Sequence, residues 1–178
     1  MKYTLIFLTA LILAGCSSSP ISTEKDLFFS ISDYFKAEIQ RLENEKPQIA
    51  KKITKDGIEE SIQTIKSWDK ELKVFIKSDI NKAAWRDLYS VDTVIDSGSK
   101  TITYVSTDKS IQVKKVVVKF SKSEVKSITI QSSEKNPLYD SSTDLFYAAD
   151  SFYTVRNKQK VRLIGKTEFF VETQFFSN

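Results

Sequence analysis

The sequence predicts an α+β fold in which an N-terminal helix and a second helix pack on a curved antiparallel β-meander sheet. In the first half of the chain, apolar residues recur every three or four positions, which is typical of amphipathic helices. From about Trp85 onward they alternate with polar residues, and Thr, Val, Ile and aromatic residues dominate, as in half-buried strands. Short turns between these runs predict that successive strands are neighbours in the sheet.

The first helix is expected over residues 24–46. Ser22 or Thr23 can cap its start, and Pro47 stops it because proline has no backbone N–H for the helical hydrogen bonds. We expect its apolar stripe to pack into the core; the stripe comprises Leu27, Phe28, Ile31, Phe35, Ile39 and Leu42.

Residues 48–66 allow two interpretations. Asp56-Gly57 lies between two β-compatible runs and predicts a hairpin, because glycine accepts the positive φ of a tight turn. Ile58, Ile62 and Ile65 also fit a helical stripe. We favour a hairpin to about residue 65, followed by a helix from about Ser67 to Ile80.

Seven strands are predicted after the second helix. Two of their turns are placed at Asn136-Pro137 and Asn157-Lys158, where turn-forming residues interrupt the alternation. The segment 144–149 fits a short helix as an alternative. The predicted strands cover residues 86–95, 100–106, 110–120, 124–132, 143–155, 159–166 and 168–176.

The amino-acid composition excludes several classes of catalytic and metal site. The 178 residues contain no histidine and one cysteine, which excludes a Ser-His-Asp triad, a Cys-His pair and an ordinary zinc site. We therefore expect no catalytic residue, no bound metal and no cofactor. The net charge of +4 is spread over the chain, so nucleic acid is not an expected partner.

The N-terminus carries the most specific motif. Lys2 is followed by an apolar run from Tyr3 to Leu13, which is shorter than the roughly 20 residues that span a bilayer. The segment Leu13-Ala14-Gly15-Cys16 resembles the lipobox of bacterial lipoproteins. The resemblance implies cleavage between Gly15 and Cys16 and attachment of acyl chains, such as palmitate, to Cys16.

This resemblance divides the chain into three segments and implies a cellular location. Residues 1–15 are expected to be a signal peptide, 16–23 the lipidated cysteine with a short tether, and 24–178 a single domain. Ser17 stands where an Asp favours retention in the inner membrane, which implies an outer-membrane lipoprotein facing the periplasm. The layout of the mature domain resembles small periplasm-facing lipoproteins of the Bacteroidetes, a resemblance that implies no known activity.

We interpret the chain as a lipid-anchored, non-enzymatic binding or scaffold subunit of the cell envelope. Its partners would be the membrane, through acyl chains on Cys16, and an envelope protein, for which the open edge of the sheet offers a place to add a strand. The alternative is a carrier or sensor of a hydrophobic ligand in a sheet-lined cavity. The candidate lining residues are Phe146, Phe152, Phe169 and Phe175.

Overall fold

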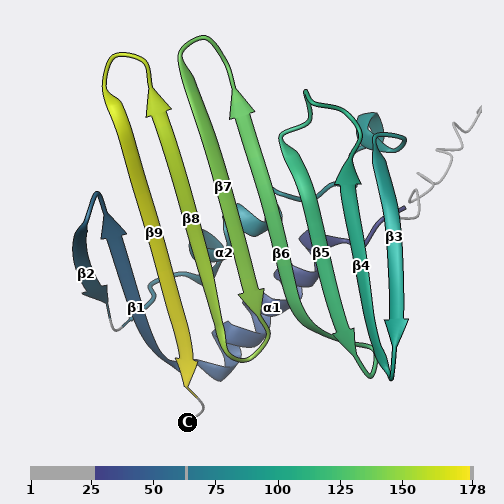
Figure 1. The fold of residues 1–178 in the computed structure, drawn as a ribbon. Helices are drawn as coiled ribbons and strands as arrows, with labels where there is room; N and C mark the ends of the chain where they lie inside the picture. Colours follow the sequence, from purple (N-terminus) through teal and green to yellow (C-terminus); the bar gives the residue numbers. More distant parts are fainter. Residues whose placement is uncertain (1–26, 63, 177–178) are drawn as a thin grey trace, which may run out of the picture.

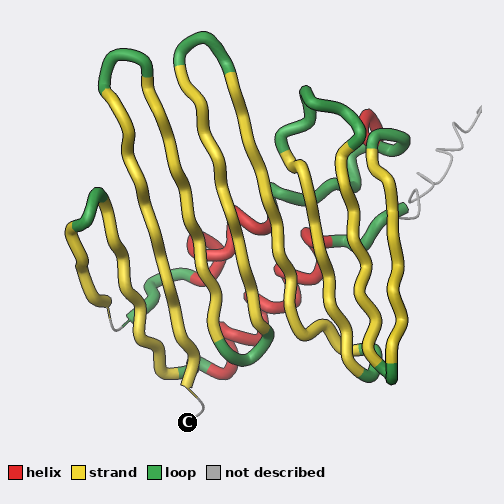
Figure 2. The backbone as a smooth tube through the Cα atoms, in the orientation of Figure 1, coloured by secondary structure: helices red, strands yellow, loops and turns green. Residues whose placement is uncertain are grey.

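The computed structural model of the protein describes residues 27–62 and 64–176, and it confirms the predicted α+β class. Two helices lie on one face of a nine-stranded antiparallel sheet (Figures 1 and 2). The predicted signal peptide, the cleavage site at Gly15, Cys16 and the tether lie outside the described residues.

Helix α1 spans Ile31–Glu45. It starts later than predicted, because Ser30 caps it by accepting a hydrogen bond from the backbone N–H of Asp33. The two phenylalanines before the cap are tied to other elements instead. The N–H of Phe28 donates to Asn81 Oδ1 at 3.0 Å, and the N–H of Phe29 donates to Tyr104 Oη at 3.1 Å.

The predicted hairpin is confirmed. Strand β1 (Gln48–Lys55) and strand β2 (Ile58–Ile62) are joined by Asp56 and Gly57, which both have positive φ, at 50° and 88°. Helix α2 (Trp68–Ile76) follows and ends before the predicted Ile80. The chain turns at Asp79, whose carboxylate accepts the N–H of Ser32 at 2.6 Å and thereby ties this loop to the start of α1.

After the short helix η1 (Ala83–Trp85), seven strands form a meander, and the order across the sheet is β2-β1-β9-β8-β7-β6-β5-β4-β3. The N-terminal hairpin therefore sits beside the last strand, with β1 antiparallel to β9. The seven strands are β3 (Tyr89–Asp96), β4 (Ser99–Ser106), β5 (Val113–Ser121), β6 (Glu124–Lys135), β7 (Tyr139–Ala148), β8 (Phe152–Val161) and β9 (Gly165–Phe176).

Two local predictions are wrong. The predicted turn at Asn157-Lys158 lies inside β8, and the predicted strand 143–155 is broken by a turn at Asp150, which has a φ of 59°. Asp tolerates this left-handed conformation, so the turn forms without glycine and leaves little sequence signal. The alternative short helix over 144–149 is also wrong, because these residues belong to β7 and the start of the turn.

The core lies between the helices and the sheet. Alternate strand residues face the helices and are mostly apolar, with Lys51 and Thr173 as buried polar exceptions, whereas the residues between them point to a face that no described element covers. The rings of Phe35 in α1 and Phe75 in α2 stack at 4.5 Å and join the two helices. Among the described residues, those of the core lie between Phe28 and Phe175, so a chain that begins at residue 17 keeps all of them.

Candidate functional site

The four candidate ligand-binding aromatics do not line one cavity. Phe146 and Phe152 lie next to each other on the uncovered face of the sheet, with ring centroids 5.3 Å apart. Phe169 and Phe175 lie on the opposite, helix-covered face and pack against the core. The structure brings the first pair together and separates it from the second pair by the thickness of the sheet.

Aromatic rings fill the space beneath the C-terminal strands. Tyr147 and Tyr153 are fully buried register partners on β7 and β8. The ring of Phe75 lies 6.0 Å from Tyr147 and 6.1 Å from Tyr153, and Phe175 lies 6.2 Å and 6.0 Å from the same two rings. These contacts are those of a packed core.

The same two tyrosines fasten the helices to the sheet. Tyr147 donates its hydroxyl proton to the carboxylate of Glu38 in α1, and Tyr153 donates to Glu71 in α2 at 2.8 Å. Burial raises the pKa of both tyrosines far above the ordinary value. Both hydroxyls therefore stay protonated and act as permanent hydrogen-bond donors, which is a structural role.

Each glutamate also has a cationic partner. Arg41 pairs with Glu38 from within α1 and reaches Asp150 in the β7–β8 turn at 3.0 Å. Lys51 of β1, which is buried, pairs with Glu71 at 2.7 Å. The charges of Glu38 and Glu71 are therefore compensated by cations within the fold.

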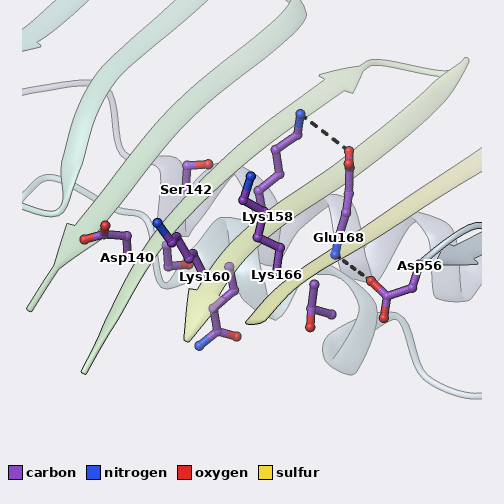
Figure 3. A pocket seen from close by; sticks show the side chains of 10 residues that line it. Asp56, Asp140, Ser142, Lys158, Lys160, Lys166 and Glu168 are labelled. Atoms are coloured by element: carbon purple, nitrogen blue, oxygen red, sulfur yellow. Dashed lines mark hydrogen bonds and ion pairs between the residues drawn. The ribbon is translucent and has the colours of Figure 1, made fainter. Parts of the chain in front are cut away.

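A pocket of about 560 Å³ lies where β7, β8 and β9 extend past the helices. Figure 3 shows Lys158, Lys160 and Lys166 in its middle, with Asp140 on one side and Asp56 on the other. Its lining is polar and mixed in charge. The carboxylate of Glu168 pairs with Lys158 at 3.6 Å, and the backbone N–H of Glu168 donates to Asp56 at 2.8 Å (Figure 3).

Strand β3 is the most exposed regular element and the candidate site for a partner. Seven of its eight residues are exposed, although several are apolar. The exposed fractions are 53% for Val91, 56% for Val94 and 73% for Ile95. Within the described part of the chain, nothing pairs with the outer side of β3, so its outer backbone groups face solvent.

The hydrogen-bond register shows which backbone groups face outward. The N–H of Thr107 donates to the carbonyl of Leu88 at 2.9 Å, immediately before β3 pairs with β4. Because hydrogen-bonded pairs alternate in an antiparallel ladder, Ser90, Asp92, Val94 and Asp96 use their backbone groups inward. The residues between them point their N–H and C=O groups away from the sheet; these are Tyr89, Val91, Thr93 and Ile95.

The opposite edge of the sheet is less suited to strand addition. Strand β2 has five residues, and two of them are Glu59 and Glu60. A short, charged edge strand discourages pairing with another chain. Sequence reasoning expected an open edge but did not say which strand forms it; the available signal was the apolar residues on both faces of 91–95.

In residues 27–62 and 64–176, no three His, Cys, Asp or Glu side chains gather into a group that could bind a metal ion. None of the helices in these segments has the length and apolar character needed to cross a bilayer.

Comparisons with protein-family models, with curated proteins and with solved structures find no match for this chain.

Proposed function

We propose that the chain is a lipid-anchored envelope protein that acts as a non-enzymatic binding or scaffold subunit at the periplasmic face of the outer membrane. Its partner would be an extended segment of an envelope protein that adds to the sheet beside β3. The exposed outer edge of β3, with eight residues, supports this proposal most directly. Main-chain hydrogen bonds along such an edge give affinity, and alternate side chains give specificity.

The side chains of β3 suggest the chemistry of that segment. Asp92 and Asp96 lie on the uncovered face of the sheet, whereas Val91 and Ile95 lie on the other face. Opposite charges and apolar pairs directly across two strands are each stabilising. The fitting partner is a strand with basic residues on one face and aliphatic residues on the other.

The position at which the chain enters the fold supports a membrane location for this edge. The ring of Phe28 lies 5.7 Å from the ring of Tyr89, the first residue of β3. Leu27 lies eleven positions after Cys16, and eleven residue steps span at most about 40 Å. Acyl chains on Cys16 would therefore hold β3 close to the bilayer.

Site-specific photo-crosslinking in the native envelope tests the binding proposal. A photoreactive residue at Thr93 should crosslink to one envelope protein, and the crosslinked peptide should contain alternating basic and apolar residues. The same photoreactive residue at Glu60 on β2 serves as the control. Equal crosslinking from both edges would contradict the proposal.

Membrane fractionation tests the anchor separately. Cys16→Ser should move the protein from the membrane fraction to the soluble fraction, because the acyl chains would have no attachment site. Protein that stays with the membrane after this change would show that lipid on Cys16 is not the anchor.

Native mass spectrometry of the chain from residue 17 separates the scaffold from the ligand carrier. A clean apo mass agrees with the ring-filled core and the scaffold proposal. A bound small molecule that leaves on unfolding would favour the carrier and direct attention to Phe169 and Phe175 on the covered face.

A further inference from the structure

Two hairpin tips lie side by side at one end of the sheet. The β6–β7 connection covers residues 136–138, and the β8–β9 connection covers residues 162–164. The backbone N–H of Arg162 donates to the carbonyl of Leu138 at 3.1 Å, which holds the two tips together. Both hairpins project beyond the helices and form the outermost part of the sheet (Figures 1 and 2).

The tips carry aliphatic residues where turns usually carry polar ones. Leu138, Leu163 and Ile164 are 72%, 96% and 82% exposed. These side chains do not pack in the core, so they add almost nothing to the stability of the fold. Burying three neighbouring aliphatic side chains at a protruding end would instead stabilise an association between the protein and another surface.

Cations surround these aliphatic side chains. Lys160, Arg162 and Lys166 are exposed and form no ion pair within the described part of the chain. Lys160 and Lys166 are register partners on β8 and β9, and both line the pocket in Figure 3. Asp140, opposite Lys160 on β7, compensates part of this charge.

We propose that the two tips dock on an anionic lipid bilayer. The three aliphatic side chains enter the boundary between headgroups and acyl chains, while Lys160, Arg162 and Lys166 bind lipid phosphates. Exposed aliphatic residues flanked by basic ones are the combination that binds such interfaces, because area burial and headgroup attraction add. Long basic side chains can also keep their charge at the headgroups while their stems lie deeper.

The topology agrees with this orientation. In the antiparallel sheet, the start of β3 lies at the same end as the starts of β7 and β9. Phe28, where the chain enters the fold, packs against Tyr89 at that end. The tips and the N-terminal entry thus face the same side, although the proposal does not depend on lipid at Cys16 and goes beyond the proposed function.

Vesicle co-sedimentation of the chain from residue 17 tests the docking. We expect binding to vesicles of phosphatidylcholine with phosphatidylglycerol, weaker binding to phosphatidylcholine alone, and loss of binding at high salt. Lys160→Glu with Arg162→Glu should lower the partition coefficient by at least about tenfold, because each basic residue near the surface contributes roughly fivefold. Leu163→Ser with Ile164→Ser should also weaken binding.

Matched variants at the other end of the sheet are the controls. Lys119→Glu with Lys122→Glu, and Val94→Ser with Ile95→Ser, change the same kinds of exposed side chain away from the tips. They should leave vesicle binding unchanged. Thermal unfolding should be the same for the tip variants as for the unmodified chain, which separates lost docking from lost folding.

A single fluorophore reports on insertion directly. The chain from residue 17 contains no cysteine, so Leu163→Cys can carry one polarity-sensitive dye, with Ile95→Cys as its control. We expect a blue shift on anionic vesicles for the dye at position 163 alone. Absence of vesicle binding by the unmodified chain would overturn the proposal. If the tip variants then impaired binding to an envelope protein, the tips would bind a protein partner and not a bilayer.

Discussion

Buried tyrosine hydroxyls and their carboxylate partners determine how the helices are held. Tyr147 and Tyr153 stand side by side on the sheet, and each hydroxyl binds a glutamate from a different helix. Each glutamate is in turn neutralised by Arg41 or Lys51. Losing one member would leave a buried polar group without a partner, which costs more than the hydrogen bond itself contributes.

The pair between Lys51 and Glu71 gives a first prediction. Lys51→Met should lower the free energy of unfolding by about 2 kcal/mol, because the carboxylate of Glu71 remains partly buried without its cation. Adding Glu71→Gln should recover part of this loss, since the amide oxygen still accepts from Tyr153 without a charge. Urea denaturation of the single and double variants measures both effects; an equal or greater loss in the double variant would contradict this account.

Tyrosine ionisation predicts the alkaline limit of stability. Burial raises the pKa of Tyr89 from 10.0 to about 12, and its hydroxyl donates to the carbonyl of Val113 at 2.7 Å. The folded state therefore binds this proton more tightly than the unfolded state does. Its stabilising contribution is complete below pH 10 and is lost as pH rises from 10 to about 12.

We therefore expect the free energy of unfolding to fall in this window. The slope from one such tyrosine is up to about 1.4 kcal/mol per pH unit. Tyr147 and Tyr153, whose pKa values are also raised by burial, add to the fall in the same direction. Denaturation curves across the window should show a shallower slope for Tyr89→Phe than for the unmodified chain; identical slopes would remove Tyr89 as a contributor.

At the scale of the elements, the register of β3 predicts two opposite outcomes for neighbouring positions. The N–H of Thr93 faces solvent, whereas that of Asp92 bonds to β4. Thr93→Pro should be tolerated, because proline on an edge strand loses a donor that nothing in the described chain uses. Asp92→Pro should lower the free energy of unfolding by about 3 kcal/mol, because it removes a ladder hydrogen bond.

Thermal or urea denaturation of the two variants measures this difference. With the photoreactive residue placed at Ile95, Thr93→Pro should also reduce crosslinking along β3, because a partner strand would lose one of its main-chain bonds. Similar destabilisation by both substitutions would show that the register assigned to the outward groups is wrong.

The elements also show where sequence reasoning succeeds. The helical stripe of α1 and the Asp56-Gly57 hairpin were predictable, because each depends on local periodicity or on a residue with unusual backbone freedom. The turn at Asp150 was not, because an aspartate replaces glycine at the positive φ and the alternation runs through it. The separation of Phe146 and Phe152 from Phe169 and Phe175 was also not predictable, because residue types do not show which face of a strand is covered.

At the scale of the whole molecule, the pairing of β1 with β9 joins the two ends of the domain. Lys51 and Thr173, register partners in this pair, are far apart in the sequence, so the core cannot close until the last strand is in place. We expect residues 17–164, which lack β9, to be digested readily by protease. Residues 17–176 should resist digestion under the same conditions, and equal resistance would show that β1 is stable without β9.

The unequal edges of the sheet set a limit on assembly. Strand β3 can accept a neighbour along its full length, whereas β2 is short and carries Glu59 and Glu60. If a partner strand adds at β3, the opposite edge of the sheet at β2 would therefore not accept a further strand. The stoichiometry would be one extended segment per molecule. The protein would therefore end the shared sheet, whereas a protein with two open edges would extend the sheet into a fibre.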